Sequence, residues 1–224
     1  MVEVLKGSPL FRGMTEDDIR GCLACSKAQV TRYEKDALVF CQGDMPESVS
    51  VLVAGAVAVC NDSNDGRRSI VATFDRPGEL FGEVFAFLNH KAYEHYAQAL
   101  APSAVLQIPE RYFYQTCGNA CEYHAKLVAN MLSIFAQKAY YLNQKMQILS
   151  CATLRQKIAK MLLCHCGADG RGMLSMGREA LADYLNVARP SLSRELMKMQ
   201  DDGLVRVGRR GVFIADLGAL QQML

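Results

Sequence analysis

The feature that most restricts the fold of this 224-residue chain is the stretch from Asn119 to Ser150, which contains neither glycine nor proline. Apolar residues recur in it at three- and four-residue steps, namely Leu127, Met131, Ile134, Tyr141, Leu142, Met146 and Leu149. This spacing predicts one helix of about 45 Å, at 1.5 Å per residue. Because so small a domain cannot cover so long a helix, we expect a partner helix and therefore a dimer. The alternative is a long helix that packs only on its own domain.

Short β-branched segments separated by glycine occupy the chain before this helix, from Val30 to about Pro109. Residues 37–40, 49–53, 57–59 and 69–74 form these segments, and Asp65-Gly66 is a hairpin signal between the last two. Such regular spacing predicts a small antiparallel β-roll. Thr15 and Asp18 have the spacing of a capping box, so a short helix is expected to begin there.

Two short helices joined by a tight turn are predicted after the long helix. Residues 178–185 form the first helix, and Asn186 suits a left-handed backbone position in the turn. The second helix begins near Arg189-Pro190, since proline is tolerated in a first turn. Its inward face carries Leu192, Leu196 and Met199, and its outward face carries Pro190, Arg194 and Met197. An apolar inner face with arginine and hydroxyls outside is what a major groove requires.

A basic hairpin follows this pair of helices. Residues 204–207 and 212–214 are predicted strands around Gly208-Arg209-Arg210-Gly211, a tip suited to phosphate contact. Residues 151–224 contain 11 Lys/Arg and 7 Asp/Glu, whereas residues 1–150 contain 14 and 16, so the positive charge lies where DNA binding is predicted. The predicted DNA contacts are Arg189, Pro190, Ser191, Ser193, Arg194, Lys198, Arg209 and Arg210.

The segment from Leu181 to Leu196, with Asp202-Gly203-Leu204-Val205, resembles the helix-turn-helix of the catabolite activator/fumarate-nitrate regulator (CRP/FNR) superfamily. The first half of the chain agrees through Ser8–Phe11, Gly43-Asp44, Val53–Gly55 and Pro77–Glu83. The resemblance implies a homodimeric bacterial transcription regulator with an α+β fold. Its parts would be a cyclic-nucleotide-binding-like, cupin-like β-roll (1–118), a dimerisation helix (119–150) and a C-terminal winged helix-turn-helix (151–224).

The resemblance also implies partners and roles. Arg189, Pro190 and Arg194 would occupy base-reading positions on a double-stranded DNA operator, although Pro190 replaces an acidic residue common in the family. RNA polymerase would be a second partner. We predict no enzyme activity, because no Ser/His/Asp or paired-carboxylate arrangement stands out.

The sensor site departs from the family pattern. In the members of this family that bind cyclic nucleotides, a Gly-Glu pair is followed later in the chain by an Arg-Ser/Thr-Ala motif that binds the phosphate. Here Gly82-Glu83 is present, but His95-Tyr96 stands before Ala97 in place of the Arg-Ser/Thr pair. A cyclic phosphate needs a bidentate cation, so we expect an unidentified small effector rather than cyclic AMP. Glu83 has an alternative role as a cap for local amides. The predicted pocket comprises Phe81, Gly82, Glu83, Val84, Tyr93, His95, Tyr96, Tyr140, Tyr141 and Gln144.

Nine cysteines leave a redox, haem or iron–sulfur sensor on the same scaffold as the alternative function. Cys22 and Cys25 could join Cys117 and Cys121, and Cys164-His165-Cys166 is a compact set, while His90 and His95 are available to haem. We favour free thiols and predict no metal site or certain cofactor, because these cysteines lie in predicted helices or lack a second ligand pair. No signal peptide or membrane-length apolar segment is evident, so we expect a cytoplasmic location without membrane association.

Overall fold

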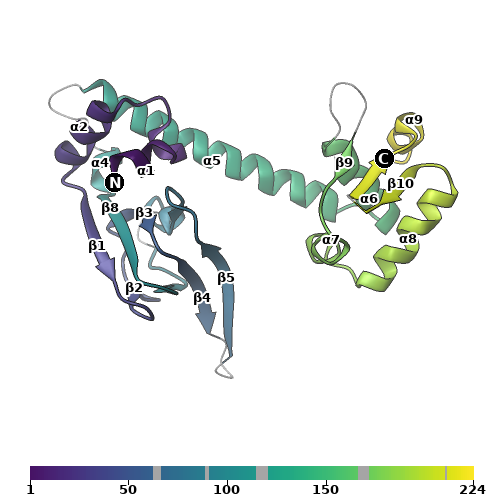
Figure 1. The fold of residues 1–224 in the computed structure, drawn as a ribbon, viewed down its shortest axis with the longest axis horizontal. Helices are drawn as coiled ribbons and strands as arrows, with labels where there is room; N and C mark the ends of the chain where they lie inside the picture. Colours follow the sequence, from purple (N-terminus) through teal and green to yellow (C-terminus); the bar gives the residue numbers. More distant parts are fainter. Residues whose placement is uncertain (63–66, 89–90, 115–120, 166–171, 210) are drawn as a thin grey trace. The chain divides into compact units, whose positions relative to one another are not determined.

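The computed structural model describes residues 1–62, 67–88, 91–114, 121–165, 172–209 and 211–224 (Figure 1). The chain forms two compact units, Met1–Ala136 and Gln137–Leu224. The predicted long helix is present as α5 (Glu122–Leu149), and the division between the units falls inside it rather than at either end.

Short helices gather at one end of the first unit, beside the start of α5 (Figure 1). They are α1 (Val2–Lys6), the 3₁₀ helix Pro9–Phe11, α2 (Glu16–Ser26) and α4 (Arg111–Tyr114). A further short helix, α3 (Glu83–Ala86), follows the strand β6 (Leu80–Phe81). The predicted capping box is confirmed at the start of α2. Asp18 N–H donates to Thr15 Oγ1 at 3.1 Å, and Thr15 N–H donates to an Asp18 carboxylate oxygen at 3.0 Å.

Two four-stranded antiparallel sheets make up the predicted β-roll. One has the order β1-β8-β3-β6 and the other β2-β7-β4-β5. The strands are β1 (Gln29–Tyr33), β2 (Leu38–Phe40), β3 (Ser48–Ala54), β4 (Val57–Asp62), β5 (Arg68–Phe74), β6 (Leu80–Phe81), β7 (Tyr96–Ala99) and β8 (Ser103–Pro109). The four segments predicted from their β-branched residues correspond to β2, β3, β4 and β5, and the Asp65-Gly66 turn lies outside the described residues.

The first half of α5 is covered by its own domain. Leu127, Met131 and Ile134 are at most 7% exposed and pack into a core with the N-terminal helices and the β1–β8–β3 sheet. The expectation that these three residues need a partner helix to cover them is therefore wrong, because the first unit covers this part of α5, whereas Tyr141, Leu142 and Met146 farther along the helix are exposed. The large apolar side chains of α5 that are exposed are those of Leu132, Tyr140, Tyr141, Leu142 and Met146, which are 54–69% exposed.

The second unit is the predicted winged helix-turn-helix. After the end of α5 it contains α6 (Leu154–Cys164), β9 (Met173–Leu174), α7 (Arg178–Leu185), α8 (Arg189–Asp201), β10 (Val205–Gly208), β11 (Gly211–Ile214) and α9 (Leu217–Gln221). Its antiparallel sheet has the order β10-β11-β9, and β9 was not predicted. Among the residues that the structure describes, no helix is long and apolar enough to cross a membrane.

Candidate nucleic-acid interface and effector pocket

The turn between α7 and α8 depends on the backbone conformation of one residue. Asn186 has φ 52° and ψ 53°, the left-handed conformation that the sequence predicted. Its N–H donates to the Asp183 carbonyl at 3.1 Å, and Val187 N–H donates to the Ala182 carbonyl at 3.0 Å. These bonds satisfy the last carbonyls of α7 and redirect the chain into α8.

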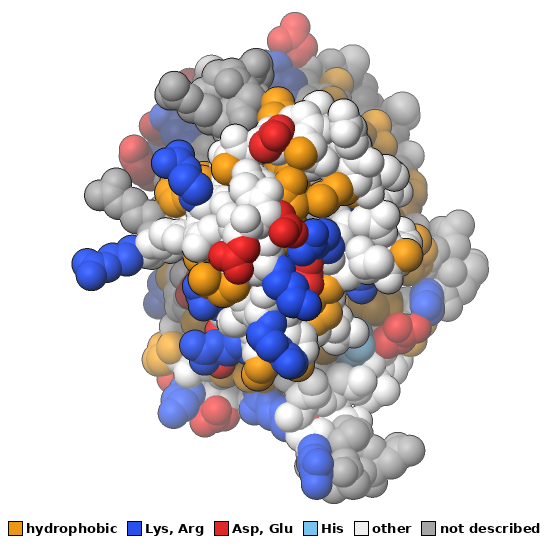
Figure 2. Space-filling model, turned by 90° about the vertical axis from the view of Figure 1, so that its right-hand side faces the viewer, with side chains coloured by type: hydrophobic (Ala, Val, Ile, Leu, Met, Phe, Trp, Pro, Cys, Tyr) orange, Lys and Arg blue, Asp and Glu red, His pale blue; other side chains and the backbone are white. Residues whose placement is uncertain are grey.

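The helix α8 separates its buried and outward residues as predicted. Leu192, Leu196 and Met199 are each 0% exposed and anchor α8 in the core of the second unit. Arg189, Pro190, Arg194 and Lys198 are exposed, and Ser191 and Ser193 are partly exposed. Figure 2 shows Lys and Arg side chains gathered across this end of the molecule, with acidic side chains beside some of them.

The wing is joined to α8 and to β9. The Val207 N–H donates to Gln200 Oε1 at 2.9 Å, which connects β10 to the last turn of α8. Gly211 has φ 143°, and a Cβ there would overlap the carbonyl oxygen of Leu174 in β9. The glycine therefore allows the wing to lie directly on β9. Arg209 is exposed at the tip as predicted, and Arg210 lies outside the described residues.

A groove of about 190 Å³ opens between the start of α7 and the wing, lined in part by Ser175, Arg178 and Arg209. The N-cap of α7, Gly177, has no side chain to accept a bond from the first amides of the helix. Free amides at a helix N-terminus, together with arginines, favour an anion. Sequence reasoning missed Ser175 and Arg178, although the glycine before a predicted helix start was a usable signal.

Aromatic rings surround Gly82 in the β-roll half of the predicted effector pocket. Gly82 has φ 71°, and a Cβ there would lie 3.1 Å from the Phe40 ring and 3.3 Å from that of Tyr93. Phe40 and Tyr93 stack with their centroids 3.8 Å apart, and Phe81 lies 5.4 Å from Phe74. Glu83 is 2% exposed, whereas Val84 is 45% exposed. The packing around Gly82 is therefore mainly aromatic.

His95 and Tyr96 differ in their surroundings. The His95 ring meets Phe85 edge-on at 6.2 Å, and its buried Nδ1 has no hydrogen-bond partner within the described part of the chain. Tyr96 begins β7, and its hydroxyl donates to Asp62 at 2.9 Å. Arg68, which the sequence analysis did not single out, lies 5.9 Å from the Tyr96 ring and donates two hydrogen bonds to the Cys60 sulfur at 3.1 and 3.2 Å. This arginine is thus a cation beside Tyr96 that is already engaged with a thiol.

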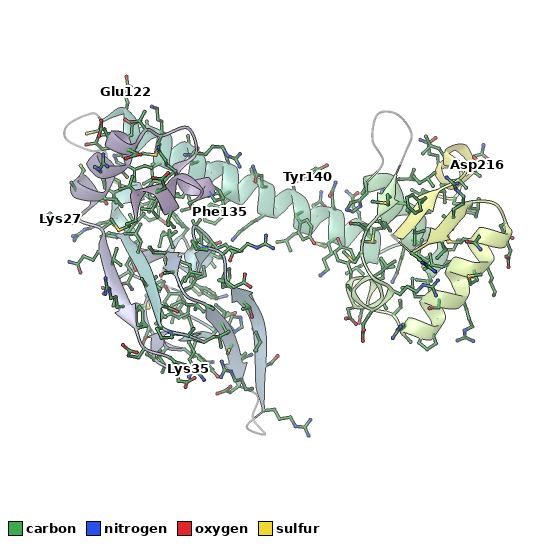
Figure 3. All side chains as sticks on the ribbon, in the orientation of Figure 1. Lys27, Lys35, Glu122, Phe135, Tyr140 and Asp216 are labelled. Carbon is green, nitrogen blue, oxygen red and sulfur yellow. The ribbon has the colours of Figure 1, made fainter. Side chains whose placement is uncertain are left out.

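The α5 half of the predicted pocket, Tyr140, Tyr141 and Gln144, belongs to the second unit. Tyr140 is 66% exposed and projects from α5 (Figure 3), where its hydroxyl accepts a bond from Gln144 Nε2 at 2.8 Å. Tyr141 hydrogen-bonds to Tyr184 of α7, and Lys145 Nζ lies 5.1 Å from the centre of the Tyr184 ring. Burial, followed by the bond to Tyr141, raises the pKa of Tyr184 to about 12. Tyr141 is therefore a contact between α5 and the helix-turn-helix.

Two cysteines of the first unit, Cys22 and Cys60, are fully buried. Cys22 is 0% exposed, and burial raises the pKa of its thiol to about 12. A thiol that stays protonated is a poor ligand and nucleophile. Within the described residues, no group of three His, Cys, Asp or Glu side chains could hold a metal ion. Cys117, Cys166 and His90 lie outside those residues.

Comparisons with known proteins match both units. Residues 30–119 match the model of the cyclic nucleotide-binding domain, and residues 156–223 match that of the Crp-like helix-turn-helix domain. The chain is 25% identical over 220 residues to the cyclic AMP receptor protein of Thermus thermophilus, covering 98% of each. It is 27% identical over 179 residues to the nitrogen fixation regulation protein FixK of Rhizobium meliloti, covering 79% of this chain and 77% of the relative.

Among solved structures, the Thermus thermophilus catabolite activator protein has the same fold, with a TM-score of 0.54 and 22% identity over 96% of this chain and 98% of the other.

Proposed function

The chain belongs to the CRP/FNR superfamily of transcription regulators, and from that premise we propose that it is a homodimer that reads a two-fold operator through α8 and responds to a small effector in its β-roll. The observation that carries this proposal is the outward face of α8. Arg194 and Lys198 are exposed there on a helix whose other face is locked into the core. We place the protein in the cytoplasm of a bacterium, because its DNA target lies there.

Specificity in this proposal comes from the first two turns of α8. Arg194 has a two-pronged guanidinium that suits the O6 and N7 atoms of guanine, and Arg189, Ser191 and Ser193 flank it. Pro190 carries no donor, so it reads bases only by apolar contact. The phosphate contacts come from Lys198, from the wing residues Arg209 and Arg210, and from Arg178 in the groove beside Arg209.

Dimerisation in this proposal uses the exposed face of α5. Val128, Leu132, Phe135, Ala139, Leu142 and Met146 follow one another at alternating four- and three-residue steps. A 3.5-residue apolar repeat is the seam of a two-helix coiled coil. Leu132, Leu142 and Met146 are 59–69% exposed, and Phe135 lies at the edge of the seam against Phe87 (Figure 3). A second copy of α5 would bury this seam. RNA polymerase would be the partner through which the DNA-bound dimer acts on transcription.

The effector in this proposal is not cyclic AMP, although one relative is named for it. The positions of the phosphate-gripping residues hold His95 and Tyr96. Tyr96 is bonded to Asp62, whose carboxylate would repel a phosphate. A lost charge-assisted contact costs about 1.5–3 kcal/mol, or roughly 10- to 100-fold in affinity.

The proposed function is tested by selecting bound fragments from a random pool of DNA duplexes. We expect a two-fold symmetric sequence with half-sites about 34 Å apart, the spacing known for dimeric helix-turn-helix proteins, of which the catabolite activator protein is a standard example. Enrichment of no sequence, with and without a cell extract, would refute the DNA-reading role.

Two further measurements test the choice of effector. Calorimetry with cyclic AMP and cyclic GMP should show no submicromolar binding. Visible absorbance bands in anaerobically purified protein would favour the redox, haem or iron–sulfur alternative.

A further inference from the structure

One arginine outside α8 contacts two carboxylates of that helix and its C-cap. Arg155 lies in the first turn of α6, and its Nε donates to Glu195 of α8 at 2.6 Å. Its Nη1 donates to Asp202, the C-cap residue of α8, at 2.7 Å. The side chains of Arg155 and Glu195 are 31% and 20% exposed, so this interaction is partly shielded from solvent, while Asp202 is 50% exposed.

The two carboxylates lie on the same side of α8. They are seven residues apart, which is about two turns of helix. Glu195 follows the base-reading candidate Arg194, and it lies three residues before Lys198 and four after Ser191. Side chains three and four residues apart are neighbours on a helix. Glu195 therefore borders the face that we propose to meet DNA.

We propose that Arg155 is a positioning residue for DNA recognition, which holds Glu195 and Asp202 away from the DNA-binding face and fixes α8 on α6. This inference rests on the proposed function. A guanidinium is suited to the task, because its rigid fork can bond two carboxylates at once, whereas an ammonium is a single point of charge.

The effect on DNA binding follows from charge and geometry. With Arg155 in place, the Arg155–Glu195–Asp202 group has a net charge of about −1 at neutral pH. Without it the same site carries about −2 beside the operator phosphates. The freed Glu195 carboxylate can then turn toward Lys198, and a lysine paired with it no longer contacts a phosphate. Both effects weaken binding without any direct contact between Arg155 and DNA.

The experiment measures operator affinity and its salt dependence for Arg155→Gln, Glu195→Gln and the double variant, with the operator obtained by selection. We expect Arg155→Gln to weaken operator binding about tenfold, equivalent to about 1.4 kcal/mol. Glu195→Gln alone should stay within about threefold of the wild type, since Arg155 still holds Asp202. The double variant should recover most of the loss, because the site then has the wild-type net charge of about −1, from Asp202 alone, and no freed Glu195 carboxylate beside Lys198. A residue with only a structural role would give no such recovery.

The matched control is Lys157→Gln, which removes one positive charge from the same helix. Lys157 lies two residues from Arg155, about 200° around the helix. We expect its effect on operator binding to be under threefold, because Lys157 lies on another side of α6 and its partly exposed charge is screened at physiological salt. A tenfold loss here would mean that net charge alone explains the Arg155 variant, which would overturn the proposal.

Two other outcomes would also overturn it: Arg155→Gln within twofold of the wild type, or losses from Arg155→Gln and Glu195→Gln that simply add. If circular dichroism shows that Arg155→Gln is unfolded, Arg155→Lys and Arg155→Lys/Glu195→Gln are compared instead. Lysine keeps the net charge but cannot hold both carboxylates as the guanidinium does, so we expect a loss above twofold for Arg155→Lys that the double variant reverses, and no loss or no reversal would overturn the proposal. A wild-type protein that binds no DNA sequence refutes the proposed function instead, so the two failures are distinguishable.

Discussion

Leu142 offers the most direct test of the proposed dimer. It lies on the exposed seam of α5 and is 59% exposed in the single chain. Fully burying a leucine side chain is worth about 1.5–3 kcal/mol, so the exposed part of Leu142 still has about 1–2 kcal/mol to contribute. A two-fold interface uses the residue twice, giving about 2–4 kcal/mol for the pair. Replacing it with aspartate removes this contribution and places two carboxylates near each other.

We therefore expect Leu142→Asp to raise the dimer dissociation constant by about 30- to 700-fold. Analytical ultracentrifugation over a concentration series measures this constant directly. The matched control is Gln137→Asp, because Gln137 is exposed on the same helix but lies about 140° around it from Leu142. The control should dimerise like the wild type. A wild-type chain that stays monomeric at micromolar concentration with operator present, or a Leu142→Asp variant with an unchanged constant, would refute the reasoning.

Three further predictions concern single residues. Arg194→Ala should weaken operator binding by about 1–3 kcal/mol and relax the preference at one base pair. Arg209→Ala should instead weaken binding to all DNA alike and lower the slope of log affinity against log salt concentration by about one. Equal losses on operator and random DNA for Arg194→Ala would contradict its base-reading role. Asn186→Val should cost about 1–2 kcal/mol in urea unfolding because φ is 52° there, while Asn186→Gly should be nearly neutral, and equal midpoints would contradict the strain argument. Cys22 should resist iodoacetamide at pH 8 while the exposed Cys164 reacts, as peptide mass spectrometry can show. Because its pKa is raised from 9.0 to about 12, the stability it contributes is complete below pH 9 and is lost as the pH rises toward 12.

The helix-turn-helix could be predicted almost entirely from the sequence. The bounds of α7, the left-handed Asn186, the start of α8 and its buried face agree with the structure. All of these depend on interactions within about four residues along the chain, such as helix periodicity, capping and the low cost of a left-handed asparagine. The capping box at Thr15 was predictable for the same reason.

The sequence indicated that α5 is long and apolar, but not which of its faces would be covered. Leu127 and Leu132 look alike in the sequence, yet one is 0% and the other 65% exposed. The difference arises because Leu127 faces the N-terminal helices and the roll, and Leu132 faces away from that core. Only the packing of distant segments distinguishes them. The partner of Tyr141 was unpredictable for this reason too, since Tyr184 is 43 residues away in the sequence.

The same limit applies to the site. The sequence by itself determined which residues of α8 face outward, because the 3.6-residue period of a helix fixes which side chains share a face. Only the tertiary structure decided what surrounds them: Arg155 reaches Glu195 across 40 residues, and Phe40 stacks on Tyr93 across 53. Neither pair has a local signal, since a guanidinium can meet any nearby carboxylate and an aromatic ring any nearby apolar surface. The choice between these partners is made when the sheets and helices pack, and packing depends on the whole chain.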